Sequence, residues 1–187
     1  MKKLLVVFVL LCLIMGGAFA ESPVAGSSVL VDVGIGLAIT DFSVVVPPIS
    51  AALTFRPANS AFSFGGFFIF TSLEDTLRIF GVSADWNATI TGFGVRFNRH
   101  FGDSNTFDPY IGTSLGWATM NMEVDVVAPG GILMGSTSAS DSGILAGVVF
   151  GMRYFFTNNI GINLELGFTR LEADTSQVAS VGLSLKF

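Results

Sequence analysis

The chain has 187 residues, of which 51% are hydrophobic and only 12% are charged, with a formal net charge of −5 at pH 7. Soluble domains carry about a quarter charged residues, so this composition argues against a water-soluble globular enzyme. Intrinsic disorder is also disfavoured, because disordered chains combine few apolar residues with many charges. The composition therefore directs the search to classes of membrane protein.

Residues 1–20 have the pattern of a secretory signal peptide. Lys2 and Lys3 precede an apolar stretch over residues 4–15, and residues 18–20 read Ala-Phe-Ala, which is a small-x-small cleavage pattern. We therefore expect export, cleavage after residue 20, and a single mature domain over residues 21–187.

Two alternatives concern the same segment. An uncleaved membrane anchor is disfavoured because the apolar stretch is short and ends at Gly16 and Gly17. A lipid anchor on Cys12 is disfavoured because Leu10 and Leu11, rather than small residues, precede it. Cleavage would leave a domain without cysteine, with seven basic and fourteen acidic residues and a net charge of −7. This charge disfavours nucleic acid as a partner.

After residue 20 the sequence contains no run of 18 apolar residues, so no helix that could span a membrane is expected there. The other structure that pairs every backbone polar group within a bilayer is a closed β-barrel. Eight segments alternate apolar with small or polar residues: 28–37, 49–56, 61–70, 91–97, 111–117, 144–154, 160–169 and 178–187. These segments predict an all-β fold, an eight-stranded antiparallel up-and-down transmembrane barrel.

The connections fit this topology. Three links, residues 57–60, 99–108 and 157–159, are expected at the periplasmic end, and two of them are short. The other links are expected to be external loops: residues 40–47, 71–86, 123–141 and 170–177. Within the third segment, Gly65 and Gly66 interrupt a face of phenylalanines and indicate a β-bulge. A soluble lipocalin-like barrel is the alternative, but the polar face is mainly glycine and serine, which suits a narrow lumen.

The sequence resembles the small outer-membrane β-barrel family that includes OmpA, OmpX and OmpW. Residues 151–170 look like the family's penultimate hairpin, and residues 109–118 look like its fifth strand. The terminal Phe187, on an alternating strand, resembles the family's assembly signal. The resemblance implies outer-membrane lipid around the barrel and recognition by the insertion machinery, but it specifies a fold and a location rather than an activity.

Catalysis on a barrel of this size would require a histidine-based constellation at the outer-leaflet end. The chain has one histidine, His100, which the predicted topology puts in a solvated periplasmic turn. No phosphate-binding loop, cysteine cluster, metal-ligand spacing or nucleophile elbow is present. The sequence therefore predicts no enzymatic activity, no metal and no cofactor.

Charged residues on the inward face indicate a cluster in the lumen. Four cations lie near the ends of descending strands, and two acids on ascending strands are their expected partners: Arg56, Arg96, Arg153 and Lys186, with Asp32 and Glu165. Buried charges must pair or hydrate, because an eight-stranded barrel is just filled by its side chains. We interpret the cluster as an ion-pair plug, with an anion-selective constriction as the alternative.

Toward the external end the inward positions are apolar: Phe67, Ile69, Met120, Met122, Leu145 and Val149. An apolar upper lumen resembles the hydrophobic pocket of OmpW-type barrels, which implies passage of small hydrophobic molecules. Core packing is the commoner explanation of such a pattern. The pattern leaves both interpretations open.

The predicted external loops carry nine acidic residues against Arg78 and Arg170, a net charge of −7. These acidic loops are candidates for binding a host or surface ligand. Residues 130–135, Gly-Gly-Ile-Leu-Met-Gly, form a candidate exposed apolar patch. The sequence thus predicts a monomeric outer-membrane barrel with a structural or surface-interaction role, and a narrow channel for hydrophobic solutes is the alternative.

Overall fold

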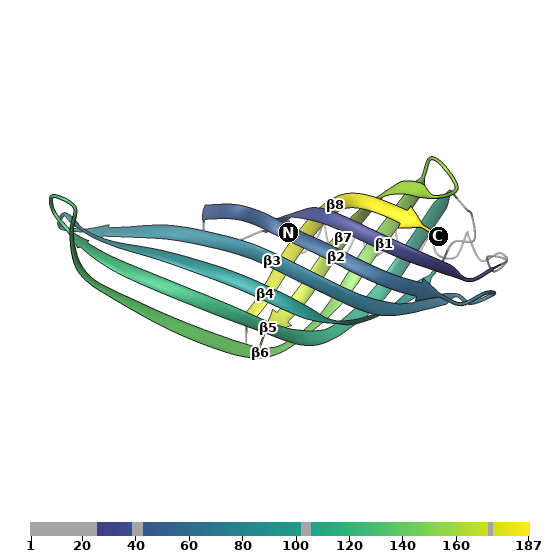
Figure 1. Ribbon diagram of the computed structural model, residues 1–187, viewed down its shortest axis with the longest axis horizontal. Helices are drawn as coiled ribbons and strands as arrows, with labels where there is room; N and C mark the ends of the chain where they lie inside the picture. Colours follow the sequence, from purple (N-terminus) through teal and green to yellow (C-terminus); the bar gives the residue numbers. More distant parts are fainter. Residues whose placement is uncertain (1–25, 39–42, 102–105, 172–173) are drawn as a thin grey trace, which may run out of the picture.

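The computed structural model describes residues 26–38, 43–101, 106–171 and 174–187, which form eight antiparallel strands in a closed ring (Figure 1). The strands are β1 (Ser28–Ala38), β2 (Ser43–Arg56), β3 (Phe62–Ile79), β4 (Val82–His100), β5 (Phe107–Ala128), β6 (Ile132–Phe155), β7 (Ile160–Leu171) and β8 (Asp174–Lys186). Each strand pairs with its sequence neighbour, and β1 pairs with β8 to close the ring. The predicted eight-stranded barrel is confirmed.

No helix in the described ranges combines the length and the apolar character needed to span a membrane.

Apolar side chains point outward and small or polar side chains point into the lumen, as the alternation predicts. On β1, Val33, Ile35 and Leu37 are half or more exposed, whereas Asp32 is 3% exposed. The same alternation holds on β4, where Phe93, Val95 and Phe97 are exposed and Asn98 is buried. An apolar outer surface of this kind is stable only against lipid. A soluble barrel has the opposite arrangement, with apolar side chains inside and polar side chains outside.

One irregularity of the sheet lies where the chain cannot donate a hydrogen bond. The β2–β3 register shifts between Val44 and Ile49, a stretch that contains Pro47 and Pro48, which have no backbone N–H. The bulge predicted at Gly65 and Gly66 is wrong, because both residues pair with β4 in unbroken register. Gly66 occupies an outward position in line with the phenylalanines, so no extra residue is needed.

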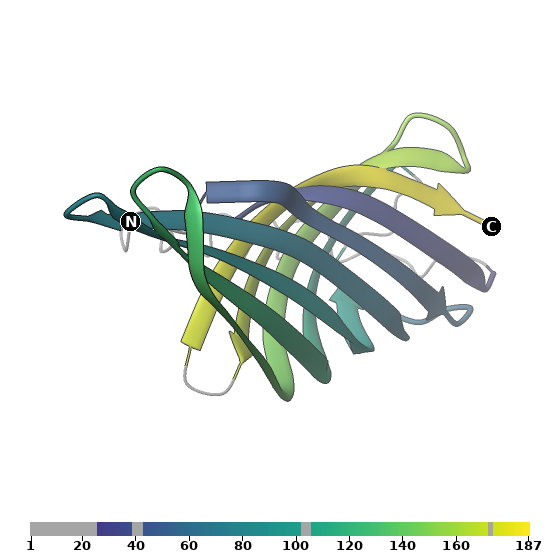
Figure 2. The same ribbon diagram turned by 60° about the vertical axis from the view of Figure 1, so that its left-hand side comes forward.

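Strand lengths divide the barrel into two halves. β1, β2, β7 and β8 have 11–14 residues, whereas β3, β4, β5 and β6 have 18–24. About 9–11 residues are enough to cross a bilayer, so the four long strands continue past the barrel. We call residues 74–87 and 119–142 the projecting sheet; Figures 1 and 2 show it extending from the barrel as one curved layer.

The predicted loops 71–86 and 123–141 are wrong, because these residues continue β3, β4, β5 and β6, which are joined by tight turns. The β3–β4 turn is Phe80-Gly81, and the β5–β6 turn is Pro129-Gly130-Gly131. Strands that have water on both faces need no apolar alternation, which is why the periodicity did not reveal them. Predicted loop residues 40–42 and 172–173 lie outside the described residues.

Glycines in the strands make room for large side chains inside the lumen. The ring of Tyr110 on β5 packs against Gly151 on β6, its register partner. A Cβ at position 151 would lie 2.3 Å from Cζ of Tyr110, which is closer than any real contact. Glycine at this position therefore lets the tyrosine ring lie flat against the barrel wall.

Replacing Gly151 with alanine should lower the free energy of unfolding by about 1–3 kcal/mol, because the added methyl group must displace the ring. Urea titration of the barrel in phospholipid vesicles measures this loss. Gly135→Ala on the projecting sheet is the control, since a Cβ there meets nothing within 4 Å. An equal effect of the two substitutions would contradict the packing explanation.

Candidate functional site

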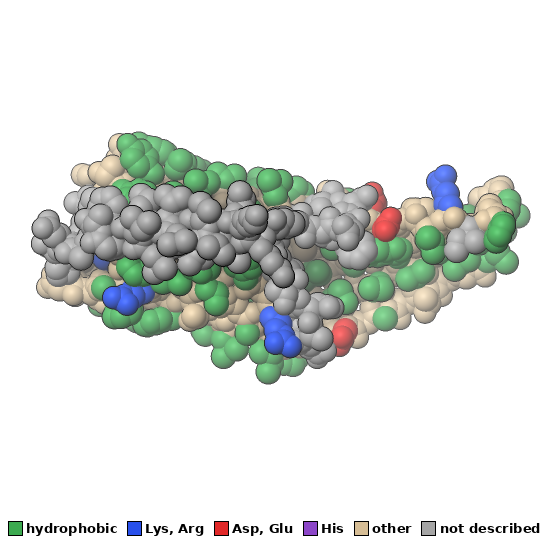
Figure 3. Space-filling view, turned by 180° about the vertical axis from the view of Figure 1, so that it is seen from behind, with side chains coloured by type: hydrophobic (Ala, Val, Ile, Leu, Met, Phe, Trp, Pro, Cys, Tyr) green, Lys and Arg blue, Asp and Glu red, His purple; other side chains and the backbone are tan. Residues whose placement is uncertain are grey.

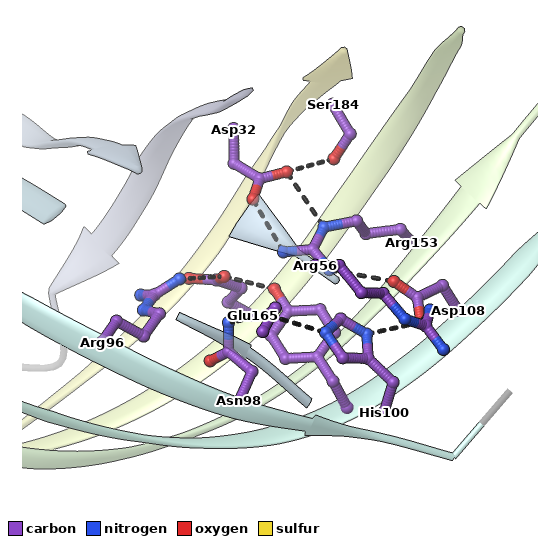
Figure 4. A network of polar contacts seen from close by, with 11 residues as sticks. Asp32, Arg56, Arg96, Asn98, His100, Asp108, Arg153, Glu165 and Ser184 are labelled. Carbon is purple, nitrogen blue, oxygen red and sulfur yellow. Dashed lines mark hydrogen bonds and ion pairs between the residues drawn. The ribbon is translucent and has the colours of Figure 1, made fainter. Parts of the chain in front are cut away.

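A network of polar side chains crosses the lumen near the end of the barrel where β8 ends (Figure 4). Every strand contributes to it: Asp32 (β1), Arg56 (β2), Ser63 (β3), Arg96, Asn98 and His100 (β4), Asp108 and Tyr110 (β5), Arg153 (β6), Glu165 (β7) and Ser184 (β8). We call these eleven residues the lumen network. Because three of its ion pairs join strands that are not neighbours, Arg153–Asp32, Arg96–Glu165 and Arg56–Asp108, the network constrains the barrel's cross-section.

Arg153 lies at the centre of the lumen network and has no exposed surface. Its Nε and Nη2 atoms donate to the two carboxylate oxygens of Asp32, at 3.1 and 2.8 Å, and its Nη1 donates to Asp108 Oδ2 at 3.0 Å. Ser184 donates a further hydrogen bond to Asp32. The guanidinium carbon lies 4.1 Å from the centre of the Tyr110 ring, a cation–π contact.

Asp108 is the second anion held by Arg153, and it also binds His100 and Arg56. Its Oδ1 lies 2.7 Å from Nδ1 of His100 and 3.5 Å from Nη1 of Arg56. The other ring nitrogen of His100, Nε2, lies 2.8 Å from Oγ of Ser63, which also accepts a hydrogen bond from Asn98. The chain of contacts therefore runs from β2 and β3 through β4 and β5 to β6.

Arg96 and Glu165 form the third ion pair of the lumen network. Nη1 and Nη2 of Arg96 donate to the two oxygens of Glu165 at 2.7 and 3.2 Å. Tyr110 also donates its hydroxyl to Glu165 while its ring contacts Arg153. Tyr110 thus joins this pair to the Arg153 cluster.

The charges of the lumen network balance when His100 is neutral: three arginines face Asp32, Asp108 and Glu165. The mutual attraction and the hydrogen bonds offset the free-energy cost of removing these charges from water. Lys186, the fourth cation predicted for the cluster, lies at the end of β8 with its Nζ 5.8 Å from the centre of the Phe155 ring.

An apolar cluster fills the lumen next to the network. Ala52, Phe67, Ala118 and Leu145 are buried against one another, and Ile69 packs on them. Val149 is also buried, on β6. Met120 and Met122 do not join them: they pair with Asp141 and Ala139 in the projecting sheet and are half-buried.

His100 is not the solvated turn residue that the sequence predicted. It is the last residue of β4, is 4% exposed and points into the lumen. The prediction was wrong because the strand continues three residues past Phe97, where the alternation of apolar residues gives way to Asn98 and Arg99.

Ser63, His100 and Asp108 are connected in the order of a serine hydrolase triad. Their surroundings differ from those of a nucleophile that must reach a substrate. Ser63 has no exposed surface, and Asp108 is shared with two arginines. The arrangement therefore buries the hydroxyl group of Ser63 among polar partners instead of presenting it to a substrate.

The acidic residues predicted in external loops lie mostly on strands of the projecting sheet: Glu74, Asp75, Asp85, Glu123, Asp125 and Asp141. Asp41 and Glu172 are outside the described residues, and so is the side chain of Asp174. Within the described part of the chain, no three His, Cys, Asp or Glu side chains are grouped as metal ligands. Phe187 follows β8, exposed, and its backbone exchanges two hydrogen bonds with Val29.

A family model described as "Outer membrane protein beta-barrel domain" matches residues 7–187. The chain belongs to this family. Members of this family are barrels that span the outer membrane, so the outward apolar side chains of the strands face outer-membrane lipid. No curated protein is significantly similar to this chain in sequence.

Solved structures of small outer-membrane barrels share the fold. The N-terminal β-barrel domain of OprF from Pseudomonas aeruginosa is 12% identical, with a TM-score of 0.54 over 89% of this chain and 100% of that chain. Neisserial surface protein A is 16% identical, with a TM-score of 0.54 over 87% and 98%. OprG from Pseudomonas aeruginosa is 11% identical, with a TM-score of 0.51 over 90% and 99%. At these identities the likeness shows the fold alone.

Sequence reasoning missed six members of the lumen network: Ser63, Asn98, His100, Asp108, Tyr110 and Ser184. Four of them are polar side chains at inward positions of the alternation, a signal that could have found Ser63, Asn98, Tyr110 and Ser184. Asp108 was missed because it falls in the link predicted over residues 99–108. The structure begins β5 before this residue, at Phe107.

Arg153→Met should lower the free energy of unfolding by about 3–5 kcal/mol, because it leaves Asp32 and Asp108 buried without their shared cation. Urea titration in phospholipid vesicles checks this value. Arg99→Met is the matched control on β4, since Arg99 is exposed on the outer face and its guanidinium carbon lies 5.3 Å from the centre of the Phe101 ring. We expect a loss of about 1 kcal/mol or less there, and similar losses for both would refute the assigned role of Arg153.

Proposed function

We propose that this protein is a non-enzymatic, monomeric outer-membrane barrel that acts at the cell surface through its projecting sheet. The observation that carries the proposal is the contrast between the two ends of the molecule. The lumen is filled by the lumen network and the apolar cluster, whereas 38 residues extend beyond the barrel as a sheet. A closed barrel that supports a long exposed sheet is suited to binding and poorly suited to transport.

The projecting sheet is expected on the outside of the cell. Bacterial barrels have short periplasmic turns and longer external connections. The β2–β3 and β6–β7 links, residues 57–61 and 156–159, are short and lie at the same end as the start of β1 and the end of β8. The projecting sheet lies at the opposite end (Figure 1).

One edge of the projecting sheet is available to a partner strand. β6 pairs with β7 only from Leu145 onward, so residues 132–144 have no second neighbour among the described residues. Most of these residues are exposed and small, and Asp141 is the only charged one. An unpaired edge of this kind offers backbone donors and acceptors to an extended segment of another protein.

A channel for hydrophobic solutes is the competing function, and the packing counts against it. The side chains of Phe67 and Leu145 that such a route would need to pass are 9% and 3% exposed. Arg153 below them is held by two carboxylates. Opening the lumen would require breaking these buried ion pairs.

Shortening both hairpins tests the surface role. Residues 75–86 and 123–138 are each replaced by Asn-Gly, which joins the register partners Glu74 and Asn87, and Met122 and Ala139. The shortened barrel should still fold, because its lumen is unchanged. Bacteria that display it should lose their retention on cultured epithelial cells, relative to bacteria that display the full chain.

Heat-modifiable migration on gels provides the folding control for the shortened protein. Retention of the shortened form equal to that of the full chain would contradict the proposal. The proposal would also be contradicted if bacteria that display the full chain were retained no better than bacteria that lack the protein.

Conductance in planar bilayers tests the closed lumen. The folded wild-type barrel should give no discrete current steps, because the buried Arg153 and the carboxylates that bind it occupy the lumen. The double variant Arg96→Ala/Arg153→Ala should give openings if it folds, since it removes two of the three guanidinium groups that fill the lumen. Discrete openings of the wild type would favour the channel and overturn the plug.

A further inference from the structure

The end of the projecting sheet is apolar although water surrounds it. Five side chains at the two turns are more than half exposed: Leu77 (58%), Phe80 (101%), Ile132 (67%), Leu133 (59%) and Met134 (67%). We call these five residues the apolar tip. The two turns lie side by side, since Ser83 pairs with Val127 and a Cβ on Gly81 would lie 3.3 Å from Pro129.

Phe80 carries two costs at once. It is the first residue of a two-residue turn between the paired Ile79 and Val82, with φ of 51°, and Gly81 follows with φ of 84°. This turn geometry favours Asn-Gly, and a bulky residue with positive φ is a rare outlier. The side chain is also fully exposed to water. Neither cost is offset by a contact within the described chain, which points to an occupant that removes Phe80 from water.

The apolar tip is apolar on both faces of the sheet. Ile132 and Leu133 are consecutive strand residues, so their side chains point to opposite faces. Both are nevertheless more than half exposed. Docking on a flat protein surface would require only one apolar face. An end with apolar side chains on both faces is suited to insertion among lipid acyl chains.

The charges of the projecting sheet are ordered along its length. Six carboxylates and Arg78 give it a net charge of −5, and Arg78 lies two residues from Phe80, nearer the end than any of the acids on β3. Figure 3 shows a basic side chain near the far end of the extension and acidic side chains closer to the barrel. A cation next to an apolar end fits the phosphate level of a lipid surface, whereas the acidic stem opposes an anionic surface or a second acidic copy.

We propose that the apolar tip inserts into an apposed lipid surface with zwitterionic headgroups. This inference rests on the proposed surface role and names the partner of the sheet's end. Phe80, Leu133 and their neighbours enter the acyl boundary, and Arg78 contacts the headgroup phosphates. The acidic stem holds the remainder of the sheet in water.

Flotation of the mature protein in lipid nanodiscs with phosphatidylcholine vesicles tests the proposal. The wild type should float with the vesicles. Phe80→Asn, which suits the turn better than phenylalanine, should weaken partitioning roughly tenfold, because burying one aromatic side chain contributes about that factor. Leu133→Ser should act in the same direction.

Phe156→Asn is the matched control, because Phe156 is 55% exposed in the β6–β7 turn at the opposite end of the barrel. It should leave flotation unchanged. Vesicles with a third of their lipid as phosphatidylserine should bind the wild type more weakly at low salt than at high salt, since salt screens the acidic stem. A Phe80→Trp variant should show a blue-shifted emission on addition of phosphatidylcholine vesicles.

Absence of wild-type flotation would overturn the lipid proposal, as would equal flotation of wild type and Phe80→Asn. If nanodiscs associated in pairs through the apolar tips of their proteins in the absence of vesicles, the tip would bind a second copy, and the lipid proposal would be overturned. The hairpin-shortening experiment separates the two proposals. If shortened hairpins abolish the retention of bacteria on epithelial cells while Phe80→Asn leaves it intact, lipid insertion is refuted. The proposed surface role is then still supported.

Discussion

The guanidinium of Arg153 is the interaction on which the rest of the lumen depends. It is fully buried, and it binds Asp32 on β1 and Asp108 on β5 from its own position on β6. Because a charge in this position is tolerable only when it is paired, the three strands must close at the spacing that brings these carboxylates together. The other pairs of the lumen network, through Tyr110 and Glu165, extend the same constraint around the ring.

In the proposed function the filled lumen takes no part in transport, and the protein acts through the outside of the barrel. The outward face of the ring is occupied by lipid, and the inner face by the network and the apolar cluster. What remains exposed to a partner is the sheet formed where β3, β4, β5 and β6 outrun their neighbours. The molecule therefore combines a rigid anchor with an exposed sheet, and its two proposed contacts, a free strand edge and an apolar end, are on that sheet.

The length of the four long strands has a physical origin in their turns. Antiparallel pairing continues as long as each strand has a neighbour, and it ends only where Phe80-Gly81 and Pro129-Gly130-Gly131 reverse the chain. Both turns use glycine at positive φ, which closes a hairpin with few residues. The positions of these turns, rather than the thickness of the bilayer, determine how far the sheet projects.

The sequence by itself determined the eight strands, their inward and outward faces and the membrane setting, because a period of two in apolar residues survives wherever one face meets lipid. It also indicated Arg96, Arg153, Asp32 and Glu165 as inward charges. Only the tertiary structure decided that His100 is buried and that residues 71–86 and 123–141 are strands. The burial of His100 could not be predicted from local sequence, because the lumen network around it is formed by residues that are mostly far apart in the chain. The long strands could not be predicted either, because strands with water on both faces carry no apolar period.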